Sequence, residues 1–82
     1  MKMQIYCLRD RHVGFLTPQF EQNEPAAIRN FEHLVSQKGN LVNFRPKDFD
    51  MYMIGEYETD SGEIQSCTPI LIANGGDFDV EE

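Results

Sequence analysis

One stretch of the sequence decides the fold: residues 23–39, NEPAAIRNFEHLVSQKG. Asn23 is a favourable N-cap, and Pro25 suits the first helical turn, where its missing N–H costs nothing. Gly39 is a typical helix terminator, so we predict a helix over residues 24–38. Its apolar residues recur at helical spacing and form one stripe that must pack against another element. They are Ala27, Ile28, Phe31, Leu34 and Val35.

Extended segments flank this helix on both sides. Residues 2–9 alternate as a strand, and a second extended segment starts near Val13, where Pro18 either confines it to a sheet edge or ends it. After the helix, residues 51–58 and 64–73 are typical of a hairpin around the turn 60–62. The order β-β-α-β-β predicts a small α+β fold, with a mostly antiparallel sheet and one helix packed on one face.

The connection between helix and hairpin, residues 40–50, is less regular. Arg45-Pro46 discourages a continuous helix, because the residue before a proline avoids helical angles. Residues 46–49 are compatible with one short helical turn. The apolar residues of the connection are expected to cover the core from outside: Leu41, Val42, Phe44 and Phe49.

Length and charge limit the function. The 82 residues suffice for one domain, which we place at residues 1–76, followed by a flexible acidic tail at 77–82. The net charge is -7, but four of the fourteen acids lie in that tail, which leaves ten acids facing seven bases in the body. This balance disfavours a large phosphate-binding surface and leaves room for a small basic patch. A domain of this size buries little surface, which favours a homo-oligomer, most simply a dimer.

Residue types that carry catalysis or bind metals are sparse. Cys7 and Cys67 form no CxxC motif and are expected to be reduced strand residues. His12 and His33 lack the spacing of a metal site or a catalytic set, so we expect no enzyme activity, no metal and no cofactor. We find no signal peptide and no apolar run long enough to cross a membrane, so we expect an intracellular protein without membrane contact.

One group of residues suggests nucleic-acid binding. Single-strand binders combine cations with aromatic faces on which bases stack. Cations cluster near the first turn and in the connection, and aromatic residues lie between them in the sequence. The candidate residues are Arg9, Arg11, His12, Arg45, Lys47, Phe44 and Tyr52. In the alternative interpretation the aromatic residues belong to the core and the cations form a solvated rim.

The tail is a second candidate site. Asp77, Phe78, Asp79 and Val80 alternate acid with apolar side chain. Such a tail resembles the acidic tips of single-strand-binding proteins, which recruit replication partners, and it can also shield a basic face from non-specific contacts. The simpler interpretation is a solubilising tail.

Several short pieces of the sequence together resemble one family. They are Asn23 with 27–31, the segment 46–49, the segment 55–57 with 60–62, and the first strand from Arg9-Asp10 on to Phe15 and Phe20. Over roughly residues 1–73 the chain resembles the small nonstructural protein of gokushoviruses, single-stranded-DNA phages of the Microviridae.

This resemblance implies a non-enzymatic accessory factor of viral genome replication in the cytoplasm of a bacterial host. Its partners would be single-stranded DNA, bound weakly and without sequence preference, and viral or host replication proteins. An alternative hypothesis is a protein–protein interaction module that touches no nucleic acid. It would bind a host or viral protein through the edge at Ile70-Leu71-Ile72 or through the tail, and the -7 charge favours it.

Overall fold

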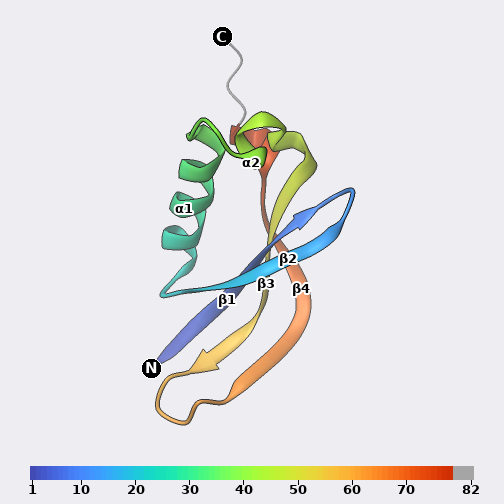
Figure 1. Cartoon of the computed structure of the whole chain (residues 1–82). Helices are drawn as coiled ribbons and strands as arrows, with labels where there is room; N and C mark the ends of the chain where they lie inside the picture. The colour runs from blue at the N-terminus through green and yellow to red at the C-terminus, as the bar shows by residue number, and fades with distance from the viewer. Residues whose placement is uncertain (79–82) are drawn as a thin grey trace.

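A computed structural model describes residues 1–78 of the chain (Figure 1). As predicted, four strands form one antiparallel sheet, and a single long helix packs on one of its faces. The strand order, which was not predicted, is β2-β1-β3-β4. In chain order the elements are β1 (Lys2–Asp10), β2 (Gly14–Glu21), α1 (Glu24–Ser36), α2 (Leu41–Phe44), the 3₁₀ turn η1 (Pro46–Asp48), β3 (Phe49–Glu58), β4 (Ile64–Asn74) and the 3₁₀ turn η2 (Gly75–Phe78).

The helix α1 forms for the reasons read from its sequence. The Asn23 side chain accepts a hydrogen bond from the Ala26 amide at 2.9 Å and caps the first turn. The helix ends at Ser36, two residues before the predicted end, and Gly39 then turns the chain at a φ of 99°. The predicted stripe faces the sheet, with Ala27, Phe31 and Val35 buried. The prediction of this element is therefore confirmed apart from its last turn.

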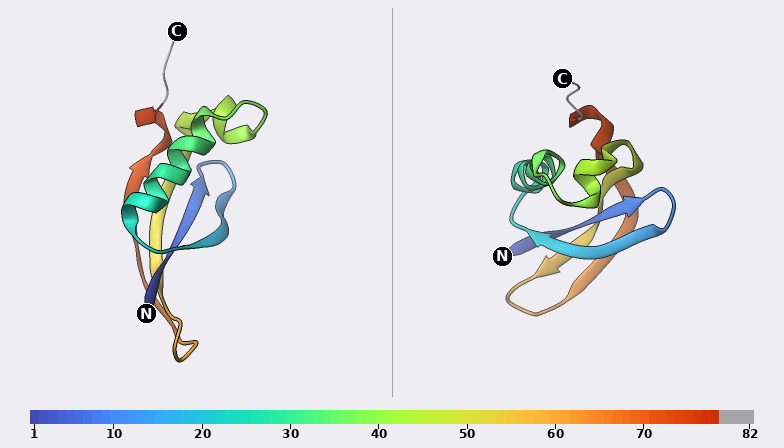
Figure 2. Two further views of the ribbon diagram at one scale, coloured as in Figure 1. Left: turned by 90° about the vertical axis from the view of Figure 1, so that its left-hand side faces the viewer. Right: turned by 45° about the horizontal axis from the view of Figure 1, so that its top comes forward.

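The hydrophobic core lies between α1 and one half of the sheet. Phe31 and Val35 pack with Tyr6 of β1 and with Phe49 and Met51 of β3. Each large side chain buried there contributes about 1.5–3 kcal/mol. The β3–β4 hairpin extends well beyond the end of α1, so its distal half has no helix against it (Figures 1 and 2).

The connection after α1 contains a short helix, α2, which was not predicted. Asn40 caps it by accepting from the Asn43 amide at 2.9 Å, and the Asn43 side chain donates to the carbonyl of Val35 at 2.6 Å. A single helical turn directs few side chains inward, and here Val42 is buried. Leu41 and Phe44 are 60 % and 74 % exposed, so the expectation that they cover the core is wrong. The short turn expected near Pro46 is present as η1.

Two prolines lie in the edge strands of the sheet. Pro18 pairs with Cys7 within β2, which continues to Glu21, so the proline confines the strand to an edge without ending it. Pro69 lies in β4, the opposite edge strand. The sequence allowed both outcomes for Pro18, and the sheet order decides between them.

The folded part extends beyond the predicted boundary at residue 76, at least as far as Phe78. Residues Gly75–Phe78 form η2, and the ring of Phe78 packs edge-to-face on Phe31, with the ring centroids 5.7 Å apart. Asp77 and Phe78 therefore belong to the domain, and Phe78 contacts the core instead of serving as a free tail residue. The other expected tail residues, Asp79 and Val80, lie outside the described residues.

Gly75 provides a test of how η2 is attached. A Cβ added at this position would lie 2.1 Å from the Pro46 carbonyl oxygen and 2.7 Å from that of Phe49, both on the backbone. Gly75→Ala must therefore push η2 away from η1, and we expect it to lower the free energy of unfolding by about 1–3 kcal/mol. Urea unfolding followed by circular dichroism measures the change.

The matched control is Gly76→Ala. Its added Cβ would meet Lys47 Cγ at 3.3 Å, in a flexible side chain that can move away. Equal destabilisation by the two variants would contradict the close approach of Gly75 to η1.

Candidate functional site

The two faces of the sheet differ in what covers them. The helix α1 lies across one face, and no described helix covers the other, which we call the open face (Figure 2). Residues paired directly across antiparallel strands point to the same side, so the strand register assigns each side chain to a face. The central residues of the open face are Ile5, Cys7, Phe15, Phe20, Tyr52 and Tyr57.

Four aromatic rings on the open face form two pairs. Phe15 contacts Tyr52 edge-to-face with centroids 5.4 Å apart, and Phe20 contacts Tyr57 in the same way at 5.3 Å. Each pair joins β2 to β3 across the intervening strand β1. The rings therefore cover the β1 side chains below them, which accounts for the burial of Ile5 and Cys7 on a face without a helix.

Two β-bulges place these rings on the same side. Phe15 and Phe20 are five residues apart, as are Tyr52 and Tyr57, and in a regular strand such residues point to opposite faces. The β1–β2 register shifts between Cys7 and Arg9, where β2 carries one extra residue. The β1–β3 register shifts between Ile5 and Tyr6, where β3 carries the extra residue. Each bulge reverses the alternation once and returns the second ring to the open face.

Arginines accompany the Phe15–Tyr52 pair. The Arg9 guanidinium lies over the Phe15 ring, 5.9 Å from its centroid. Arg11 donates two hydrogen bonds of 3.1 Å to the carboxylate of Asp50, which is 5 % exposed. The buried Asp50 thus holds the Arg11 side chain in place, and it raises the pKa of Arg11 through these hydrogen bonds. We call Arg9, Phe15, Tyr52 and Leu71 the arginine row: on this face Arg9 pairs with Phe15, Phe15 contacts Tyr52, and Tyr52 pairs with Leu71.

The structure brings together only part of the predicted nucleic-acid site. Arg9, Arg11 and Tyr52 lie together on the open face. His12 and Arg45 instead face a common carboxylate, Asp48, at 3.4 Å and 3.7 Å, where η1 meets the β1–β2 turn. Lys47 lies on η1 beside Gly76.

Phe44 lies on α2 and is exposed. It forms none of the aromatic pairs found within residues 1–78. Asp48 and Asp50 were not part of the predicted site, and they offset much of the positive charge at this end of the sheet.

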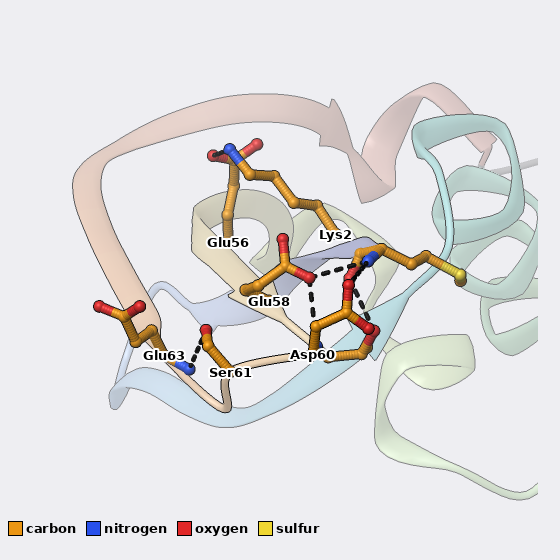
Figure 3. Close-up of polar contacts among 8 residues, drawn as sticks. Lys2, Glu56, Glu58, Asp60, Ser61 and Glu63 are labelled. Atoms are coloured by element: carbon orange, nitrogen blue, oxygen red, sulfur yellow. Dashed lines mark hydrogen bonds and ion pairs between the residues drawn. The ribbon is translucent and has the colours of Figure 1, made fainter.

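The opposite end of the sheet is acidic (Figure 3). Lys2 Nζ lies 4.0 Å from a carboxylate oxygen of Glu56, and the amino group of Met1 lies 2.8 Å from Glu58. Glu63 pairs with Glu58 through a backbone hydrogen bond of 2.9 Å across the hairpin. The register places Lys2, Glu56 and Glu58 on the α1 side of the sheet, beyond the end of the helix. The charge of the domain is therefore separated along the sheet.

A recess lies between α1 and the strands β1 and β2. Its volume is about 100 Å³, and Tyr6, Leu8, Phe31 and Leu34 are among its lining residues. Burial raises the pKa of the Tyr6 hydroxyl, and Glu24 and Glu21 raise it further. The recess is smaller than the roughly 300–1,000 Å³ typical of small-molecule sites.

Within residues 1–78, no set of three His, Cys, Asp or Glu side chains is placed to hold a metal ion. Over the same residues, no helix is long and apolar enough to span a membrane. Both cysteines are free, Cys7 buried and Cys67 exposed.

The fold and its surface define a class: a small α+β domain whose sheet has a helix on one face and arginines and aromatic rings on the other. Comparison with protein families matches residues 3–78 to the family described as Phage ORF5 protein, and the chain belongs to this family of phage proteins. Comparison with curated proteins and with solved structures gives no match.

The two arginines near the Phe15–Tyr52 pair are expected to differ in their effect on stability. Arg11→Gln removes both hydrogen bonds to the buried Asp50 carboxylate and leaves that charge without its guanidinium partner. Arg9→Gln removes an exposed cation that forms no ion pair with any described residue. We expect the melting temperature to fall for Arg11→Gln and to change little for Arg9→Gln. A larger fall for Arg9→Gln would contradict the structural role of the Arg11–Asp50 pair.

The two thiols are expected to react at very different rates. Burial raises the pKa of the Cys7 thiol, which donates a hydrogen bond to the Leu16 carbonyl. Less thiolate is then present at neutral pH, and the reagent has little access to it. Ellman's reagent should modify Cys67 rapidly and Cys7 only at the rate of unfolding, and Cys67→Ser should abolish the fast phase. Two fast phases would show that the aromatic rings do not cover Cys7.

Proposed function

We propose that the protein is a non-enzymatic accessory factor of genome replication in a single-stranded-DNA phage, acting in the cytoplasm of the bacterial host. It would bind single-stranded DNA weakly and without sequence preference through the arginine row. Membership of a phage protein family supports a viral role, and the resemblance to gokushovirus nonstructural proteins points to single-stranded-DNA phages. The observation that carries the DNA-binding proposal is the Arg9 guanidinium over Phe15, beside Tyr52, on a sheet face without a helix.

The chemistry of the arginine row suits a flexible single strand. Every base has a π-face, so stacking on an aromatic ring tolerates any sequence, and it contributes about 1–3 kcal/mol per base. Arg9 and Arg11 lie close enough to the rings to contact the phosphates of a stacked strand. A duplex would offer only the edges of its stacked bases to the same rings.

The charges around the arginine row determine the affinity that we expect for DNA. Asp50 pairs with Arg11, and Asp48 lies beside His12 and Arg45, so the local excess of positive charge is small. Binding should therefore depend more on stacking than on phosphate contacts. If Arg9 and Arg11 each contact one phosphate, the logarithm of the binding constant should change with the logarithm of salt concentration by a slope of about −1.4.

A protein-interaction module with no nucleic-acid contact is the alternative. The net charge of -7 favours it, as does the exposure of Leu41 and Phe44 on α2. The expected edge site at Ile70-Leu71-Ile72 is split in the structure. Leu71 lies on the open face opposite Tyr52, Ile70 lies opposite Met53 on the α1 side, and Ile72 packs against the core. The α2 surface is therefore the better candidate for this function.

Fluorescence anisotropy of a labelled oligothymidine tests the proposal. The protein is titrated at 20 and 200 mM salt, and we expect weak binding that loosens with salt along the shallow slope given above. Arg9→Gln should weaken binding several-fold and reduce the slope by about 0.7, because one phosphate contact is lost. Phe15→Leu should weaken binding at both salt concentrations, because it removes a stacking surface.

Arg29→Gln is the matched control, since it removes the same charge from an exposed position on α1, on the other side of the sheet. If Arg29→Gln weakens binding as much as Arg9→Gln, the arginine row is not the site. If no binding occurs even at 20 mM salt, the nucleic-acid proposal is wrong and protein partners take its place.

A further inference from the structure

A second row of side chains crosses the open face at its acidic end. Tyr57 pairs with Met3 on one side and with Ile64 on the other, and its ring contacts Phe20. These four residues, Met3, Phe20, Tyr57 and Ile64, come one from each strand and form what we call the apolar row. Phe20 is 46 % and Ile64 is 63 % exposed, so the row is open to solvent in a single copy of the chain.

The charged side chains at this end of the sheet lie mostly on the side opposite the apolar row, and Ile64 also borders the recess that they line. The register places Lys2, Glu56 and Glu58 on the opposite side, and Glu63 lies directly across from Glu58. The distal part of the sheet thus has a charged side and an apolar side, although no helix covers either (Figures 1 and 3). This is the pattern of a sheet face that is buried against a partner.

We infer that the apolar row is the contact surface between two copies of this chain. The distribution of charge favours a second copy of the chain over a nucleic acid at this surface. A nucleic acid needs cations, and the two at this end of the sheet, Lys2 and the amino group of Met1, are paired with Glu56 and Glu58. A second copy presents an identical apolar row, so the two rows can meet about a two-fold axis while the acids of both copies stay turned toward solvent.

The contact is between faces, because both edges of the sheet resist strand addition. Pro18 in β2 and Pro69 in β4 each lack a backbone N–H, and each interrupts the row of donors that an added strand would need. A face-to-face contact at the apolar row leaves the arginine row at the far end of each protomer.

The apolar row supplies few side chains, so the dimer should be reversible. Specific interfaces of standard size involve about 20–30 residues on each side, far more than the four residues of the row. We expect a dissociation constant on the order of 10–500 µM, in the range of weak and transient complexes. Sedimentation equilibrium of the full chain from 5 µM to 1 mM should therefore show a monomer–dimer transition.

Ile64→Glu tests the surface, because it places a charge in the apolar row of both protomers. We expect it to raise the dissociation constant at least tenfold, and Ile64→Lys should act alike because the disruption does not depend on the sign of the charge. Ile70→Glu is the matched control. Ile70 lies on the same strand and is 49 % exposed, but it faces the α1 side opposite Met53. Circular dichroism and thermal melting establish that each variant is folded.

Each possible result either supports or overturns the inference of a dimer. A transition that Ile64→Glu and Ile64→Lys abolish and Ile70→Glu preserves supports the inference. A chain that stays monomeric to 1 mM overturns it, as does a dimer that Ile70→Glu disrupts and Ile64→Glu does not. Should the Ile64 variants fail to fold, Phe20→Ser provides the same test from the opposite edge of the row. None of these results depends on DNA binding, so this inference and the proposed function can fail separately.

Discussion

A mismatch in length between the helix and the sheet governs the rest of the structure. The 13 residues of α1 span about 20 Å, whereas the 10 and 11 residues of β3 and β4 span about 33–36 Å. One helix can therefore cover only the half of one face that contains Tyr6 and Met51. The other half and the whole opposite face must be stabilised by side chains of the sheet itself. The two aromatic pairs on the open face do this by covering Ile5 and Cys7.

The helix and the order of elements could be predicted because their signals are local. The cap at Asn23, the apolar stripe and the turn residues of the β3–β4 hairpin lie within a few positions of the structure they determine. The helix α2 and the turn η2 could not be predicted in the same way. The Asn43 side chain is tied to Val35 and Phe78 packs on Phe31, and both contacts depend on segments brought together only by the fold. Four residues carry too few positions to show a helical period.

The candidate site was predicted only in part, because some of its contacts also depend on segments that the fold brings together. Arg9, Arg11 and Tyr52 were expected to lie near one another, and they do because β1 and β3 are neighbours in the sheet. The sequence did not reveal that Asp50 would hold Arg11 or that Arg45 would face Asp48. The buried side of β3 cannot be predicted from the sequence either, because the residues around Ile54 break the two-residue alternation. The bulge at this position is the physical origin of that ambiguity.

The two bulges also link the lengths of β2 and β3. The extra residue in β2 keeps Phe20 on the open face, and the extra residue in β3 keeps Tyr57 there, so that the two rings can meet. A relative that lost the extra residue from β2 alone would turn Phe20 toward α1 and leave Tyr57 without its neighbour. A relative that lacks the extra residue of one strand should therefore also lack that of the other, or should have a different residue at the position of Phe20 or Tyr57. The spacing between aromatic residues in β2 and β3 would then vary together across the family, as a record of which relatives keep both aromatic pairs on the open face.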